Sequence, residues 1–204
     1  MSEPSSTHAG AARIDRWLFA VRLAGSRVLA AAAEQADFDY SPLDRARISH
    51  TLAMALTALA EAVDDDNLYD HALAAFDQAL AVLEPVRALA LRAVTAHDRA
   101  ACVARRAERR GDARALAQAE LSFRAELAVR DAGADPVAWA VTQLALTRIY
   151  IAQAELLGGT PPPPEAAMAL TEALEVFTER GLKTLAGTAQ DQLTRLKGVM
   201  VRDD

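Results

Sequence analysis

The most constraining feature of this 204-residue sequence is a pattern that recurs every 47 positions. The tetrapeptides ALAV, ELAV and ALEV end at Val82, Val129 and Val176. The same offset aligns further columns: Ala72, Ala119 and Ala166; Phe76, Phe123 and Leu170; Glu61, Glu108 and Glu155; and Leu52, Leu146 and Leu193. A fixed period of about 20–50 residues is typical of arrays in which each repeat is one supersecondary unit.

Each period contains two helical patterns. Alanine, leucine, arginine and glutamate lose little rotamer freedom in a helix and dominate the chain, whereas runs of β-branched residues typical of strands do not occur. The first helices are expected at about residues 42–63, 88–110, 136–157 and 183–198, and the second at about 68–84, 113–131 and 164–180. The sequence therefore predicts an all-α fold built from antiparallel helix pairs.

Capping residues support these boundaries. Pro42 and Pro136 suit the first turn of a helix, where the N–H that proline lacks would be unpaired in any case. Ser41 and Asp135, directly before them, are suitable N-caps. Gly181 suits the end of a helix, because glycine readily adopts the left-handed conformation found there.

The chain reads as a single repeat domain. Residues 13–36 carry an apolar stripe at helical spacing and precede the first full pair, where an array needs an end cap. We expect a disordered tail over 1–12, then one domain over 13–200 made of a cap helix (13–36), repeats at about 41–86, 87–134 and 135–181, and a C-terminal helix (182–200).

The run PVAWAVTQLAL (136–146) resembles the first-helix signature of long-period, tetratricopeptide-like (TPR-like) repeats of bacterial proteins. The matching residues are Pro136, Trp139, Ala140, Thr142, Gln143 and Leu146, with ALEV at 173–176. A weaker copy begins at Pro42, with Arg45 in place of the tryptophan, and the resemblance covers about residues 40–198. It implies a right-handed α-solenoid of about eight helices whose groove binds a peptide or protein, and it carries no shared catalytic residues.

Composition excludes several classes of function. The net charge of −6 argues against a general nucleic-acid or membrane-surface binder, and no uncharged apolar run approaches the length of a membrane span. Cys102 is the only cysteine, which favours the cytoplasm and rules out a disulfide within the chain. We find no metal-ligand set, phosphate loop or acid–base pair, and therefore expect no metal, no cofactor and no catalysis.

Eight arginines lie between Arg87 and Arg114 against three acidic residues. Arg92, Arg99 and Arg106 are seven residues apart and share one helix face, which Arg110 continues. Such a stripe can clamp the carboxylates of an acidic partner. The alternative is a solvated face neutralised by acidic neighbours within the chain.

Arg99 stands in a column that is otherwise leucine, so its side chain is expected to point inward. A buried cation needs a partner, and Glu126 and Glu120 of the following helix are the candidates. The alternative is an Arg99 side chain that reaches water along the helix surface.

Trp139 and Gln143 lie one helical turn apart and form a second candidate contact. They can serve as an aromatic anchor with a polar neighbour in a groove. The alternative is that Trp139 fills space between repeats and Gln143 bonds to a nearby loop.

The first functional hypothesis is a non-enzymatic adaptor that binds a protein or peptide, and that can self-associate through an end helix. The second is an RNA-associated protein that uses the basic N-terminal helix together with residues 87–110. Residues 13–30 are similar to the opening of an RNA-binding motif of ribosomal proteins and pseudouridine synthases. The acidic run EQADFDYSPLD follows in place of that motif's β-hairpin, so the match stops halfway.

Overall fold

A computed structural model of the chain describes residues 41–84, 88–157 and 161–200. These residues form seven helices and no strand: α2 (Pro42–Val63), α3 (Asp66–Leu83), α4 (Leu89–Arg110), α5 (Ala113–Val129), α6 (Pro136–Leu157), α7 (Pro164–Glu179) and α8 (Lys183–Met200). The predicted all-α class is confirmed, and the boundaries follow the predicted ones closely. The expected tail and cap helix (1–12 and 13–36) lie outside the described residues.

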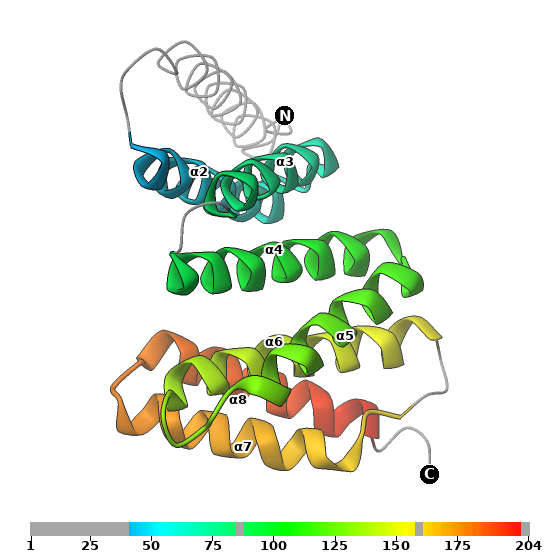
Figure 1. Cartoon of the computed structure of the whole chain (residues 1–204). Helices are drawn as coiled ribbons and strands as arrows, with labels where there is room; N and C mark the ends of the chain where they lie inside the picture. The colour runs from blue at the N-terminus through cyan, green and yellow to red at the C-terminus, as the bar shows by residue number, and fades with distance from the viewer. Residues whose placement is uncertain (1–40, 85–87, 158–160, 201–204) are drawn as a thin grey trace, which may run out of the picture.

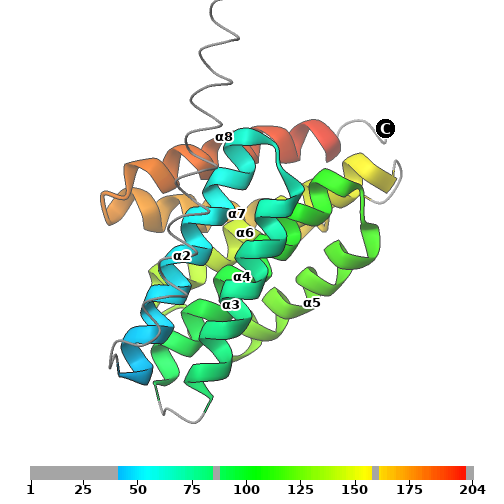
Figure 2. The ribbon, with the colours of Figure 1, turned by 90° about the horizontal axis from the view of Figure 1, so that it is seen from above.

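The helices pack in chain order. Each helix contacts the next, and the first helices of successive pairs also touch, α2 with α4, α4 with α6 and α6 with α8. Figure 1 shows α2 and α3 on one side of α4, with α5 to α8 on the other. In the perpendicular view of Figure 2, α7 and α8 run across the direction of α2 and α3, so the stack turns along its length.

The predicted capping residues explain where several helices begin and end. The Ser41 hydroxyl accepts a hydrogen bond from the backbone N–H of Asp44 at 3.2 Å, and the Asp135 carboxylate accepts one from Ala138 at 3.2 Å. Each satisfies an N–H group that the helix itself leaves unpaired. Gly181 follows α7 with φ of 67°, a conformation that an L side chain would strain.

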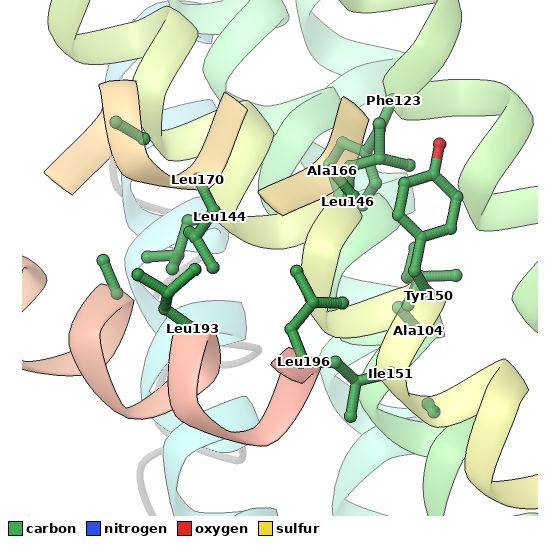
Figure 3. Packing of buried hydrophobic residues seen from close by; sticks show 14 of the residues in the cluster. Ala104, Phe123, Leu144, Leu146, Tyr150, Ile151, Ala166, Leu170, Leu193 and Leu196 are labelled. Atoms are coloured by element: carbon green, nitrogen blue, oxygen red, sulfur yellow. The ribbon is translucent and has the colours of Figure 1, made fainter. Parts of the chain in front are cut away.

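Two of the columns that the 47-residue period aligns lie in the core. Ala72, Ala119 and Ala166 are all at most 4% exposed, and the larger column of Phe76, Phe123 and Leu170 is at most 1% exposed. The alanines let neighbouring helices approach, while the larger side chains fill the space between them. Figure 3 shows this packing in the second half of the chain, where Phe123, Leu146, Tyr150, Leu170 and Leu193 are buried together with neighbouring residues.

The core divides into two clusters that meet at α4. Cys102 belongs to the cluster formed with α2 and α3, whereas Ala104 and Ala107 belong to the cluster formed with α5 to α8. The side chains that α4 contributes to either cluster are small, so it fills little interlayer volume.

An ion pair also recurs with the period. The Glu155 carboxylate accepts a hydrogen bond from Arg195 at 2.9 Å, and Glu108 accepts one from Arg148 at 2.8 Å. Both the glutamates and the arginines are 47 residues apart, so one contact joins α4 to α6 and its copy joins α6 to α8. Arg148 also reaches Glu61 of α2 at 3.3 Å and thus links three successive first helices.

Tyr69 carries a buried hydroxyl group that has no hydrogen-bond partner among the described residues. Burial, together with the nearby charge of Glu61, raises the pKa of Tyr69 to about 12. An unpaired buried hydroxyl costs about 1–3 kcal/mol. We therefore expect Tyr69→Phe to raise the free energy of unfolding by about 1 kcal/mol, as measured by urea denaturation.

Tyr150→Phe is the matched control for this prediction. Tyr150 is 9% exposed, and the Arg124 guanidinium lies 5.7 Å from its ring centroid. Burial raises the pKa of the Tyr150 hydroxyl, and the nearby charge of Arg124 opposes this shift. Removing this hydroxyl is expected to lower the free energy of unfolding by about 1 kcal/mol. Two changes of the same sign would contradict the assignment of the Tyr69 hydroxyl as unpaired.

Candidate functional site

The arginine stripe of α4 faces the acidic helix α3. The pairs are Arg99 with Asp77 (2.6 Å), Arg106 with Asp70, and Arg110 with Asp66 (2.9 Å). From Arg99 to Arg110 along α4, the partner shifts from Asp77 to Asp66 along α3 by the same number of residues in the opposite direction. Two antiparallel helices pair their residues in this way. Arg105 and Arg109 add pairs with Glu61, Asp64 and Asp66. These arginines therefore have acidic partners within the described chain.

The predicted carboxylate partner of Arg99 is wrong. Its side chain is 38% exposed and pairs with Asp77, not with Glu126 or Glu120. Arg99 would point inward, like the leucines at the equivalent positions, only if α4 were rotated about its axis as α2 and α6 are. In the structure the Arg99 side chain instead reaches Asp77 of α3. Arg92, at the start of the stripe, is exposed and forms no ion pair with any described residue.

Trp139 and Gln143 both lie on α6 and are partly buried. Trp139 packs against the larger core cluster, as the space-filling alternative expects. Gln143 forms no hydrogen bond within the described chain. Neither residue lines the hollows described next.

One column behaves differently in the middle repeat. Ala46 of α2 and Ala140 of α6 are fully buried, whereas Ala93, their equivalent on α4, is exposed. α4 also starts without the Ser–Pro or Asp–Pro cap of α2 and α6, since Ala88 offers no capping side chain. The first half of α4 is thus less covered than its counterparts, and two hollows open there.

The larger hollow has a volume of about 870 Å³ and lies between α3 and α5, with α4 as its floor. Ala93, Ala96 and Ala100 of α4 line it together with Ala119 and Ala125 of α5. Small side chains leave this space unfilled. Its ionisable side chains are Asp77, Arg99, His97, Glu126 and Arg130, of which the two carboxylates match the two arginines in number.

The smaller hollow has a volume of about 410 Å³ and lies between the first halves of α4 and α6 and the end of α5. Its wall is mainly apolar, with Ala90, Ala93, Val94, Val137, Ala138 and Val141. The ionisable side chains on its wall are His97, Asp98, Glu126, Arg130 and Asp135. Ala93, His97, Glu126 and Arg130 line both hollows.

Glu126 is the centre of a polar cluster between the two hollows. Its carboxylate lies 3.0 Å from Nδ1 of His97, accepts a hydrogen bond from Thr142 at 3.0 Å, and pairs with Arg130. The His97 and Glu126 side chains are 12% and 19% exposed. A half-buried carboxylate with three partners joins α4, α5 and α6 at this point.

The environment of Glu126 shifts its titration. Burial alone would raise the pKa of this carboxyl, but hydrogen bonds from His97, Thr142 and Arg130, together with the nearby His97 charge, outweigh burial and lower the pKa. A lowered pKa contributes stability that is present above the pKa of an unfolded glutamate, about 4.3, and is lost as the pH falls through the folded value.

Glu126→Gln is expected to remove this contribution. The difference in free energy of unfolding between wild type and Glu126→Gln should be largest near neutral pH and should shrink below about pH 5. Urea denaturation at a series of pH values measures it. A difference that grows on acidification would contradict the assigned role of the Glu126 carboxylate.

Sequence reasoning missed the shared role of two histidines. The ring of His50 packs edge-on to Phe76 (centroids 5.9 Å apart), and that of His97 packs edge-on to Phe123 (5.1 Å). Both pairs are related by the 47-residue period. His50 also lies 3.1 Å from the Thr95 hydroxyl and 3.4 Å from Asp98. The signal was present, because the histidines and the phenylalanines share the same offset.

Within the described residues, no group of three or more His, Cys, Asp or Glu side chains gathers where it could hold a metal ion. Cys102 is buried, and burial raises the pKa of its thiol, which disfavours the nucleophilic thiolate. Within these same ranges, no helix has both the length and the apolar character needed to cross a bilayer.

No protein-family model, curated protein or solved structure matches this chain.

Proposed function

We propose that the chain is a non-catalytic adaptor, built as a right-handed α-solenoid of TPR-like helix pairs, which binds a protein or peptide partner over the first half of α4. The observation that carries the proposal is the exposure of Ala93, whose equivalents Ala46 and Ala140 are fully buried. A partner bound there would bury Ala93 as fully as Ala46 and Ala140 are buried.

The geometry around Ala93 supports a partner surface. Two hollows of about 870 and 410 Å³ meet at this residue, and both are open to solvent between rigid helices. Sites on packed helices are pre-organised, so a partner pays little to order them. The contacts of α2 with α4, α4 with α6 and α6 with α8 support the solenoid, since a stack of helix pairs brings successive first helices together.

Self-association through the C-terminal end helix has less support. Large exposed apolar side chains occur on α2, α4, α5, α6 and α7, but none of them is on α8. A polar outer face is what a terminal repeat needs for solubility.

A bulky substitution at Ala93 tests the proposal. Ala93→Trp places a large ring in both hollows and removes no core contact, while Ala117→Trp introduces the same ring at an exposed position of α5 that lines neither hollow. The full chain is used to select binders from a random peptide library. Selected peptides should bind wild type and Ala117→Trp equally, and bind Ala93→Trp about tenfold more weakly or worse. A failure to recover any peptide weakened by Ala93→Trp, with circular dichroism showing the variant folded, would contradict the proposal.

A further inference from the structure

The smaller hollow, between α4 and α6, has the features of a side-chain pocket. Its wall is largely formed by Ala90, Val94, Val137 and Val141. Val94 is 51% exposed, and Leu89, on the preceding turn of α4, is 74% exposed. Covering such side chains stabilises a complex by about 25 cal/mol for each Å² of apolar surface buried. An aliphatic group therefore suits the interior of this hollow.

The two hollows differ in the balance of charged side chains on their walls. In the larger hollow Asp77 and Glu126 are matched by Arg99 and Arg130. The smaller hollow has the three carboxylates of Asp98, Glu126 and Asp135 against the single arginine Arg130, with His97 as the other titratable side chain. An occupant of the smaller hollow therefore meets a negative field, which repels an anion and attracts a cation.

Of the three carboxylates on the smaller hollow, Asp98 is the one without an arginine in an ion pair. Its side chain is 20% exposed, and its only ion-pair partner among the described residues is His50, at 3.4 Å. Burial raises the pKa of Asp98, although His97 and His50 oppose the shift. Glu126 already has three partners, and Asp135 caps α6. A purely apolar ligand would bury Asp98 further without supplying a cation, which is unfavourable.

From this geometry we infer that the smaller hollow takes an aliphatic side chain of a partner peptide, with an adjacent lysine or arginine of that peptide against Asp98. This inference rests on the proposed adaptor function and assigns both the position and the chemistry of its partner.

The peptide selection on the full chain tests the inference with two further variants. Val94→Trp fills only the smaller hollow, and Ala96→Trp fills only the larger one; both positions are exposed. Peptides selected on wild type should be enriched in an aliphatic residue beside lysine or arginine. They should bind Ala96→Trp normally and Val94→Trp about tenfold more weakly.

The cation is tested by fluorescence anisotropy on one selected peptide. Its analogue with norleucine in place of the cationic residue should bind wild type about tenfold more weakly. Asp98→Asn should reduce that preference to about threefold or less, whereas Asp77→Asn, on the larger hollow, should leave it unchanged. Added salt should weaken the cationic peptide more than its norleucine analogue.

Each contrary outcome has its own meaning. Peptides that are acidic or lack a cation, or that are blocked by Ala96→Trp but not by Val94→Trp, overturn this inference while the adaptor function stands. Self-association in sedimentation experiments that Val94→Trp abolishes assigns the hollow to a second copy and also overturns it. The absence of any peptide sensitive to Ala93→Trp overturns the adaptor function itself.

Discussion

Replacing Phe123 with alanine is expected to lower the free energy of unfolding by about 3–5 kcal/mol. Phe123 is 1% exposed and belongs to the larger core cluster (Figure 3). Its ring also packs edge-on with that of His97, with centroids 5.1 Å apart. The loss combines the transfer energy of the ring with a cavity that α5 and α6 cannot fully close. Urea denaturation of the full chain, followed by circular dichroism, measures the change.

Phe123→Leu is the matched control, and the repeat predicts its outcome. Leucine occupies the equivalent position in the next repeat, where Leu170 is fully buried. We therefore expect Phe123→Leu to cost about 1 kcal/mol, because most of the volume is kept. If leucine and alanine were equally damaging, the column would not define a common core position.

The second large effect is expected at Glu126. The repeat alone predicts that alanine is tolerated there, because the equivalent residues Ala79 and Ala173 are both fully buried alanines. The structure predicts the opposite. Glu126→Ala leaves Arg130, His97 and Thr142 without their shared acceptor, and loss of one partner from a largely buried ionic cluster costs about 3 kcal/mol.

Glu120→Ala distinguishes this cluster from an ordinary surface pair. Glu120, on the same helix, pairs with Arg124, whose side chain is 52% exposed, and accepts a hydrogen bond from Gln153. Such a pair contributes about 0–1 kcal/mol. Chemical denaturation of both variants should show a clearly larger loss for Glu126→Ala. Equal losses would mean that the Glu126 cluster does not hold α4, α5 and α6 together.

The helices could be predicted because their signals are local. Ser41 and Asp135 cap the helices that they precede, and Gly181 adopts the conformation that its position suggested. The period then located the core, since residues at one helical position in each repeat meet the same neighbours. This reasoning succeeds where a residue's environment depends on its own helix and the adjacent one.

The partners of the arginines could not be placed in this way. An arginine's position on its helix follows from the sequence, but its partner depends on how two helices are rotated and aligned. A signal did exist: Asp66, Asp70 and Asp77 are spaced by four and seven residues, as are Arg110, Arg106 and Arg99 in reverse. Residues that pair between two antiparallel helices have the same spacings in reverse order. An aspartate partner on α3 could therefore have been predicted for Arg99.

The hollows depend on a departure from the repeat, so the repeat could not predict them. Ala93 looks equivalent to Ala46 and Ala140 in the sequence but is exposed in the structure. In the middle pair, α4 begins without a proline cap, and alanines of α4 and α5 line the larger hollow. An average over repeats hides this difference, and the candidate site lies where it occurs.

The central claim is that residues 47 positions apart occupy the same place in successive layers. The most direct measurement is a set of proton–proton nuclear Overhauser effects on the isotope-labelled full chain. The His50 ring should show cross-peaks to the Phe76 ring, and the His97 ring to the Phe123 ring, because both pairs of centroids lie within 6 Å in edge-on geometry. Cross-peaks at one pair alone, or at neither, would contradict the stacking of equivalent helix pairs.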